Sequence, residues 1–371
     1  MVIKLKKLLI TMTVSGAAAL TAGPAGAERV TVMASGLDHP WSMAFLPGGD
    51  VLVTERAGRL LRLKAGSKPR PVAGVPAVRL EKQGGLFDVV LHPRFADNGL
   101  IYLSYAAGTK AANFTRITRA RLDGDRLVER RVIFEVSPAK DTPVHFGGRM
   151  AFLPDGSLVM TTGDGFDYRE QAQRLQSGLG KIMRMADDGR PLAGNPFANG
   201  QGGVKGAQPH IWSFGHRNPQ GLAVDPVGGR LWEHEHGPKG GDELNLIQKG
   251  GNYGWPVATF GLDYSGATIT PFKRYKGMID GRAVWVPSIA PSGLAVYRGA
   301  LWPEWQGDLI LGALVNKEVR RVDVDAAGRV VGQERIFASI TARIRDVRVA
   351  PDGAIWLTTD EEKGRVLRVT P

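Results

Sequence analysis

The chain repeats one short pattern along most of its length. In each copy an alternating apolar run reaches a turn that contains Pro or Gly, and a second alternating run follows. The six copies begin near Gly36, Gly85, Arg149, Gly221, Gly293 and Ile344. Alternation of apolar and polar residues is typical of β-strands, and Pro and Gly reverse the chain between neighbouring strands. Each copy is therefore predicted to be a β-hairpin with further strands beside it.

Three of the turns have closely similar sequences. They are Pro47-Gly48-Gly49, Pro154-Asp155-Gly156 and Pro351-Asp352-Gly353. Proline presets φ, while Asp and Gly tolerate the tight reversal that joins adjacent strands. Helical periodicity is scarce, and the stretch 168–176 predicts only a helical turn or two.

The first 27 residues form a separate segment. Lys4, Lys6 and Lys7 precede a short apolar run over residues 8–20, and small residues stand at 25–27. This is the pattern of a secretory signal peptide, and the apolar run is shorter than the roughly 18 to 20 residues that span a bilayer. We therefore expect a cleaved signal peptide at 1–27, a mature domain at 28–371, no stable membrane insertion and a periplasmic location.

Without that segment 344 residues remain, which is about 57 for each copy of the repeat. A four-stranded propeller blade typically takes roughly 40 to 50 residues, so there is room for long loops. A row of β-sandwich domains is the alternative, but no Pro/Ser-rich linker interrupts the pattern. The predicted fold is therefore all-β, a single six-bladed β-propeller with four-stranded antiparallel blades. Functional residues are expected in the loops that converge at the mouth of its central channel.

The composition excludes several chemistries. The chain has no cysteine, which excludes disulfides, thiolate metal sites, iron–sulfur clusters, covalently attached c-type haem and cysteine nucleophiles. A redox reaction would therefore need a non-covalent cofactor. The formal net charge is +12, or +9 without the leader, so an anionic cofactor or ligand is one explanation. Nucleic acid is a poor candidate, because the Lys and Arg residues are dispersed and the protein is predicted to be exported.

Polar residues stand immediately before several copies of the repeat. His145, in the sequence VHFGGR, is followed by two glycines that let a ligand approach the backbone, and its titration range suits a general base. Arg217, in GHRNPQG, is suited to donate to a carboxylate or carbonyl of a ligand. From these residues alone, a structural role for each side chain remains the alternative.

Further cations occur near the C-terminus. Arg343 and Arg345 place two guanidinium groups on one side of an extended chain, and Lys317 lies between strands of the preceding copy. One interpretation is a solvated basic face. If these three cations and Arg217 instead converge on the channel, they suit a small polyanion with several carboxylates.

The densest polar segment is HEHGPKGGDELN, at residues 234–245. His234 and His236 could suggest zinc, but a complete zinc site needs at least three protein ligands and no third is obvious nearby. The segment also offers oxygen donors, namely the carbonyls of Gly237 and Pro238 and the carboxylates of Asp242 and Glu243. Irregular, oxygen-rich loops with glycine favour calcium, and a polar turn without metal is the alternative.

Five motifs, taken in order, resemble a known family. They are QGGLFDVVLHP, HFGGRMAFLPDG, GHRNPQGLAVDP, EHGPKGGDELNLIQKGGNYGWP and RIRDVRVAPDG. Together they resemble the soluble pyrroloquinoline quinone (PQQ)-dependent sugar dehydrogenases, and most closely the periplasmic aldose sugar dehydrogenases. The resemblance covers essentially all of residues 28–371, and DELNLIQKGGNYGWP is its most specific part. It implies a six-bladed propeller with PQQ at the channel mouth, bound calcium, an aldose substrate oxidised to its lactone, and a separate external electron acceptor.

The resemblance also implies roles for individual residues. His145 matches the base that takes the sugar hydroxyl proton, and Arg217 matches a residue that binds the cofactor and polarises its quinone oxygens. The implied cofactor contacts are Gln83, Arg217, Asn218, Tyr264, Lys317, Arg343 and Arg345. The implied calcium contacts are the Gly237 and Pro238 carbonyls beside PQQ and, at a structural site, Glu243 and Tyr253.

Two positions depart from the glucose dehydrogenase branch of that family. His236 stands where the branch has Gln, and Val144 stands where it has Asp. We therefore expect broad aldose oxidation. We also expect the enzyme to be a monomer. A non-catalytic periplasmic propeller that binds a protein or glycan and a calcium-dependent lactone hydrolase are the alternatives. The dehydrogenase is favoured because a binding scaffold has no need for a base, a guanidinium cluster and a calcium loop together.

Overall fold

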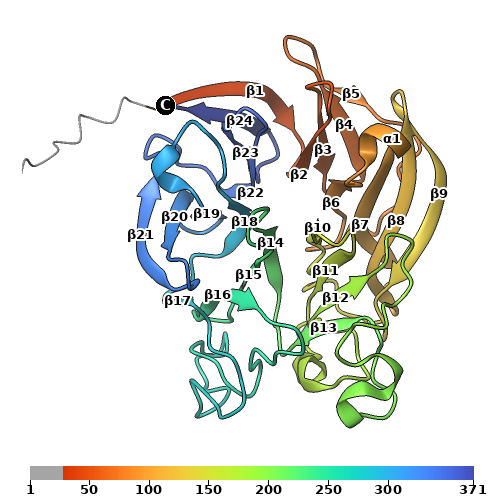
Figure 1. Cartoon of the computed structure of the whole chain (residues 1–371), viewed down its shortest axis with the longest axis vertical. Coiled ribbons are helices and arrows are strands. Elements are labelled where there is room, and N and C mark those ends of the chain that lie inside the picture. The colour runs from red at the N-terminus through yellow and green to blue at the C-terminus, as the bar shows by residue number, and fades with distance from the viewer. Residues whose placement is uncertain (1–27) are drawn as a thin grey trace, which may run out of the picture.

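The computed structural model describes residues 28–371, so the predicted signal peptide lies outside the described residues. Six four-stranded antiparallel sheets surround a common centre (Figure 1). From the inner to the outer strand, the first three sheets are β2 (Pro40–Phe45), β3 (Val51–Glu55), β4 (Arg59–Leu63) and β5 (Arg70–Pro71); β6 (Leu86–Leu91), β7 (Leu100–Gly108), β8 (Asn113–Asp123) and β9 (Arg126–Glu135); and β10 (Met150–Phe152), β11 (Leu158–Thr162), β12 (Lys181–Met185) and β13 (Ile211–Phe214).

The remaining three sheets follow the same plan, except that the outer strand of the last sheet is β1, from the beginning of the described chain. They are β14 (Pro219–Val224), β15 (Leu231–Glu235), β16 (Asp242–Ile247) and β17 (Ala283–Trp285); β18 (Pro291–Val296), β19 (Leu309–Ala313), β20 (Glu318–Val324) and β21 (Val330–Ile336); and β22 (Ile344–Val349), β23 (Ile355–Thr359), β24 (Gly364–Thr370) and β1 (Arg29–Leu37). The predicted six-bladed propeller with four-stranded antiparallel blades is confirmed.

The hydrophobic core lies between neighbouring blades. Leu52 and Leu60 of the first sheet pack with Leu86, Ile101 and Leu103 of the second, and all five side chains are buried. Each such burial contributes about 1.5–3 kcal/mol relative to an exposed side chain. The inner strands β2, β6, β10, β14, β18 and β22 contact one another in sequence around the ring. Successive side chains of a strand point to opposite faces of its sheet. Each blade therefore buries both faces, one against each neighbouring blade.

The ring is closed by strands from both ends of the described chain. The N-terminal strand β1 pairs antiparallel with β24, so the last blade is completed by residues 29–37 (Figure 1). The repeated pattern in the sequence does not predict this pairing, because β1 precedes the first complete copy.

The predicted turns join the first and second strands of three blades. In each, a backbone N–H donates across the turn, from Leu46 to the Asp50 carbonyl, from Leu153 to that of Ser157 and from Ala350 to that of Ala354, all at 2.8 Å. The predicted helical turns at 168–176 correspond to the 3-10 helix η1 (Arg169–Gln173). The other helices are equally short, namely α1 (Phe95–Asn98), η2 (Ala198–Gly203) and η3 (Pro303–Trp305). Within residues 28–371 no helix is both long and apolar enough to cross a membrane.

Two connections are much longer than the others. Residues 186–210 join β12 to β13, and residues 248–282 join β16 to β17. In Figure 1 they form the green and teal loops beyond the strands at one end of the view. The expectation of long loops outside regular blades is met by these two segments.

Candidate active site

A cavity of about 290 Å³ opens where segments from all six blades converge. The contributing segments are the first residues of inner strands, the loops that precede these strands, and the loops that follow the second strand of a blade. One lining residue from each blade in turn is Trp41, Gln83, Phe146, Asn218, Leu314 and Arg345. The cavity therefore lies at the mouth of the ring, where the sequence predicts functional residues.

The cavity has cationic and aromatic walls. Arg56, Arg343 and Arg345 line it together with the rings of Trp41 and Phe87. A flat, anionic molecule would therefore find stacking surfaces and charge partners in the same space. Of the predicted cofactor contacts, the structure brings together Gln83, Asn218, Arg343 and Arg345 in this cavity.

Arg345 is held by an acid on the cavity wall. Its Nη2 donates to Asp360 Oδ2 at 2.7 Å, while its Nε is buried and has no hydrogen-bond partner among the described residues. Burial would raise the pKa of Asp360, but the charge of Arg345 and hydrogen bonds from His39 and Arg345 lower it well below its usual range. The pair therefore stays ionised, and Arg345 keeps one donor free.

A second cavity, also about 290 Å³, lies among the loops of the third and fourth blades. Arg217, Tyr264 and Pro238 line it. The Arg217 Nη1 group donates to the Gly237 carbonyl at 2.7 Å and to the His236 carbonyl at 3.0 Å. Arg217 thus lies in the second cavity while its neighbour Asn218 lines the first.

His145 lies between the two cavities. Its successors Phe146 and Gly147 line the first, and Phe166, which packs edge-on against the imidazole at 5.2 Å, lines the second. The imidazole Nδ1 is 2.7 Å from Asp164 Oδ1. Because a carboxylate only accepts, Nδ1 carries the proton and Nε2 keeps its lone pair. This is the arrangement of a base held by an acid.

The surroundings of Asp164 make this pair rigid. Its Oδ2 accepts a hydrogen bond from Trp255 Nε1 at 2.8 Å, and its own backbone N–H donates to the Arg217 carbonyl at 2.8 Å. Burial lowers the pKa of His145 below its ordinary value, against the raising effect of Asp164 and with further lowering by Arg217 and Lys140. At neutral pH the imidazole is therefore uncharged and able to accept a proton.

The backbone around His145 leaves no room for larger residues. His145 has φ of 52° and its N–H donates to Gln83 Oε1 at 2.9 Å. A Cβ on Gly163 would lie only 2.2 Å from the His145 carbonyl oxygen, so glycine is required there. Gln83, predicted as a cofactor contact, therefore also holds the backbone of the predicted base.

Tyr264 and Lys317 are both exposed. Tyr264 is 57% exposed and its hydroxyl oxygen lies 3.4 Å from Arg217 Nη2. Lys317 lies in the exposed turn between β19 and β20, with φ of 52°, close in sequence to the cavity residues Leu314 and Val315. Its side chain is not among those that line either cavity.

The residues predicted to bind calcium separate into two places. The Gly237 carbonyl is engaged by Arg217, whereas the carbonyls of Pro238 and Tyr253 accept no hydrogen bond from the part of the chain that the structure describes. Glu243, on β16, has a pKa raised well above its ordinary value by burial and by the charge of Glu235. Its environment would favour a bound cation.

Asp242 has a different role from the one its sequence context suggests. Its Oδ2 accepts hydrogen bonds from Ser288 Oγ at 2.7 Å and from the N–H groups of Ile289 and Ala290 at 2.9 Å, and its Oδ1 accepts one from the Gly237 N–H at 2.9 Å. These four donors occupy the carboxylate. It therefore ties two loops together and is not an available calcium ligand.

The histidines of the same segment do not form a zinc site. His236 Nε2 is 2.7 Å from the Pro291 carbonyl, and His234 Nε2 is 3.4 Å from that of Gly293. Burial lowers the pKa of each to about 3. Both are therefore neutral donors to backbone carbonyls, which is the structural alternative to zinc.

Comparison with known proteins identifies the family. Residues 37–368 match the family model described as glucose/sorbosone dehydrogenase. The chain belongs to this family.

Individual relatives in the sugar dehydrogenase family are similar to this chain over nearly its whole length. The aldose sugar dehydrogenase YliI of Escherichia coli is 42% identical, over 95% of each chain. The crystal structure of the soluble aldose sugar dehydrogenase of E. coli in its apo-form superposes with a TM-score of 0.88 at 40% identity, covering 93% of this chain and 99% of the other. The PQQ-bound aldose sugar dehydrogenase of Streptomyces coelicolor has a TM-score of 0.74 at 30% identity, over 94% and 100%. The family resemblance of the motifs is confirmed.

Two residues that position the site, Asp164 and Arg149, were not identified from the sequence. Asp164 is the fourth residue of the run TTGDG, two residues after the end of β11, and only the fold shows that it contacts His145. Arg149 is buried, donates to the Gln220 and Arg345 carbonyls at 2.8 and 2.9 Å and pairs with Asp346 at 2.8 Å. Each is a charged residue beside glycine at the end of a strand, Arg149 just before β10 and Asp164 just after β11, and sequence alone does not distinguish such a residue from a surface charge.

Proposed function

We propose that this protein oxidises aldoses to their lactones, with PQQ as cofactor and an external electron acceptor. The observation that carries the proposal is the His145–Asp164 pair beside a cavity with three guanidinium groups. The names of the E. coli and S. coelicolor relatives support the sugar class, and the PQQ-bound form of the latter supports the cofactor.

The residues of the cavity fit PQQ. The cofactor is planar and has three carboxylates, and Arg56, Arg343 and Arg345 supply three cations around aromatic walls. Both Arg56 and Arg345 have a buried Nε with no partner among the described residues, so the protein alone does not satisfy every donor of these two guanidinium groups. We include Gln83 and Asn218 as further polar contacts, together with the exposed Tyr264 and Lys317.

When bound, PQQ would supply the acceptor for the hydride that leaves the sugar carbon. Loss of hydride from C–OH must be matched by loss of the hydroxyl proton, and His145 Nε2 would take that proton to leave the carbonyl of the lactone. Asp164 would stabilise the imidazolium that results. Arg217, which lines the second cavity, would stabilise negative charge that develops on the quinone oxygens.

We also propose two calcium roles. The carbonyls of Gly237 and Pro238 would hold an ion beside the cofactor, where a Lewis acid is useful, with Gly237 using the lone pair that does not accept from Arg217. Glu243 and the Tyr253 carbonyl would hold a structural ion, because Glu243 is an acid in an environment that disfavours its charge unless a cation is present.

The location and assembly state complete the proposal. The N-terminal pattern indicates export to the periplasm with cleavage after Ala27, and we propose that the mature protein is a monomer. Mass spectrometry of the protein recovered from a periplasmic fraction should give an N-terminus at Glu28, and an intact Met1 would contradict this.

Reconstitution tests the function. Purified apo-protein is combined with PQQ and Ca²⁺, and several aldoses are supplied with an electron-accepting dye. We expect dye reduction that requires both PQQ and sugar. Demonstrated PQQ binding without dye reduction on any aldose would overturn the proposal and favour a binding module, and lactone hydrolysis without PQQ would favour the hydrolase.

A further inference from the structure

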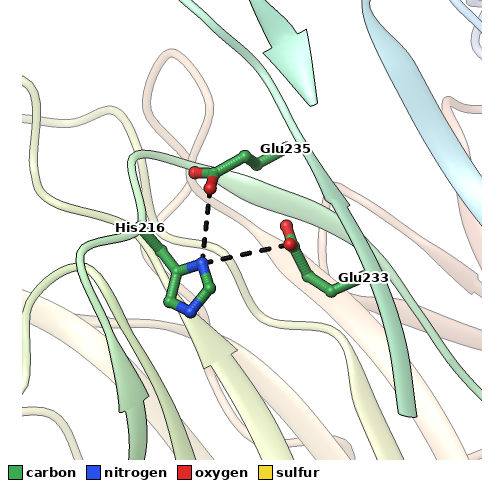
Figure 2. A group of neighbouring side chains, drawn as sticks. All are labelled: His216, Glu233 and Glu235. Atoms are coloured by element: carbon green, nitrogen blue, oxygen red, sulfur yellow. Dashed lines mark hydrogen bonds and ion pairs between the residues drawn. The ribbon is translucent and has the colours of Figure 1, made fainter. Parts of the chain in front are cut away.

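A group of buried ionisable side chains lies behind the Arg217–Asn218 segment. His216 Nδ1 is 3.3 Å from Glu235 Oε1 and 3.9 Å from Glu233 Oε2. Figure 2 shows the three side chains pointing toward one another from two neighbouring segments. One possible ligand atom from each lies within 4.8 Å of the other two, and all three residues are buried.

The strand geometry explains why these side chains meet. Glu233 and Glu235 are two residues apart on β15, so they share one face of the sheet. Asn245, opposite Glu233 on β16, extends the group, with its Nδ2 3.0 Å from Glu233 Oε2. Glu243, one of the residues proposed above for calcium, stands opposite Glu235 on β16, so the face carries three carboxylates with an amide and an imidazole beside them.

One carboxylate of the group, that of Glu233, lacks a donor for one of its oxygens. Glu233 is fully buried, yet its Oε1 has no hydrogen-bond partner within residues 28–371, and the same is true of Asn245 Oδ1. No Lys or Arg in the described chain forms an ion pair with Glu233 or Glu235. A buried carboxylate oxygen without a donor is costly, and a cation bound by this side chain would offset that cost.

The imidazole is oriented as a metal ligand would be. His216 Nε2 is 2.9 Å from Ser213 Oγ, and the ring stacks on Tyr253 with centroids 4.7 Å apart. When Nε2–H donates to the serine, Nδ1 presents its lone pair to the carboxylates. Ligands of a tetrahedral Zn²⁺ with bonds of about 2.0 to 2.1 Å are roughly 3.3 Å apart, which is the separation of His216 Nδ1 and Glu235 Oε1.

We propose that His216, Glu233 and Glu235 form a binding site for a divalent transition-metal ion such as Zn²⁺, with Asn245 as a further oxygen donor. An imidazole nitrogen among the ligands favours Zn²⁺ over Ca²⁺, which takes oxygen donors. The site uses none of the four residues proposed above for calcium. It also stands independently of the proposed sugar chemistry.

The site would be linked to the cofactor cavity through Glu235. Its Oε2 accepts hydrogen bonds from the backbone N–H groups of both Arg217 and Asn218. An ion on the other carboxylate oxygen would hold Glu235 in place and, through it, the segment that carries these two predicted cofactor contacts.

Zinc titration of the full mature protein tests the site. Protein stripped with a chelator and reloaded with Ca²⁺ is titrated with Zn²⁺ by isothermal titration calorimetry, with bound metal counted by mass spectrometry. We expect one equivalent of Zn²⁺ in the wild type and a loss of affinity of at least tenfold in Glu233→Gln. Glu334→Gln, an exposed acid on β21, is the matched control and should bind as the wild type does.

Equal zinc uptake by the wild type and Glu233→Gln, or no uptake by the wild type, would overturn the site. If Glu233→Gln does not fold, anomalous diffraction at the zinc edge of wild-type crystals decides, with a peak expected about 2.0 to 2.1 Å from His216 Nδ1. A zinc peak found only elsewhere, or Ca²⁺ rather than Zn²⁺ in this position, also contradicts the proposal.

Discussion

His145 has a backbone conformation that L-residues rarely adopt, and it is not alone near the cavities. Lys82, Phe166, Ala290 and Lys317 also have positive φ, between 51° and 68°, and each lines a cavity or is within three residues of one that does. Non-glycine residues in this region cost of order 1–3 kcal/mol and persist where the surrounding structure enforces them. At the residue scale, strain is therefore concentrated at the mouth of the ring.

Replacing the proposed base gives the most direct prediction. His145→Ala should lower turnover by about 10²- to 10⁴-fold, because the hydroxyl proton loses its acceptor, while PQQ affinity stays near the wild-type value. Steady-state kinetics and a PQQ titration measure the two effects. A variant with full turnover would remove His145 from the base role.

The pH dependence follows from the same residue. Burial lowers the pKa of His145 below its ordinary value of 6.5, and a protonated imidazole cannot accept a proton. Turnover should therefore be retained at pH 6.5 and fall only as the pH drops further, with a midpoint below 6.5 in a plot of kcat/KM against pH. An acid limb centred above 6.5 would contradict the assignment.

Arg345 allows a test of the cofactor cavity. Arg345→Ala should weaken PQQ binding roughly 10- to 100-fold, as expected for the loss of hydrogen bonds to a charged group. Arg368→Ala, which removes a guanidinium on β24 that pairs with Asp352, is the control and should leave PQQ affinity unchanged. Fluorescence titration measures both, and equal affinities for the two variants would show that Arg345 does not contact PQQ.

Individual elements depend on a few polar side chains that join them. Asp242, at the start of β16, holds the Gly237 loop on one side and the entry to β18 on the other through four accepted hydrogen bonds. Burial nevertheless raises the pKa of Asp242, against the lowering effect of those donors. Inner strands are thus positioned by carboxylates as well as by apolar packing.

This role of Asp242 predicts a stability effect. Asp242→Ala leaves buried N–H groups without an acceptor, and we expect the free energy of unfolding to fall by about 3 kcal/mol. Asp97→Ala, at an exposed position in α1, should change it by less than about 0.5 kcal/mol. Urea unfolding followed by tryptophan fluorescence measures both, and equal stability of the two variants would contradict the role.

The whole molecule is a ring closed by β1. Because β1 supplies the outer strand of the last blade, the described chain has both its ends in one sheet (Figure 1). Without β1, the edge of β24 would be exposed and the contacts of the buried Leu37 would be lost.

Deleting residues 28–37 tests that closure. We expect the free energy of unfolding to fall by at least about 3 kcal/mol, comparable to truncation of a large buried side chain, with a lower Tm in calorimetry. Protein that begins at Glu28 is the reference. A truncated chain with the reference Tm would show that the ring does not depend on β1.

The amino-acid sequence by itself determined the six repeats, their strands and turns, and the family, because alternation and turn chemistry act between residues close in the chain. It also placed His145, Arg217 and Arg345 among the candidate site residues. The tertiary structure alone decided which side chains meet. Arg149 reaches the Arg345 carbonyl across 196 positions, Asp164 reaches His145 across 19, and β1 joins β24. Packing of strands and blades creates these contacts and the burial that shifts pKa values, and no local pattern encodes either.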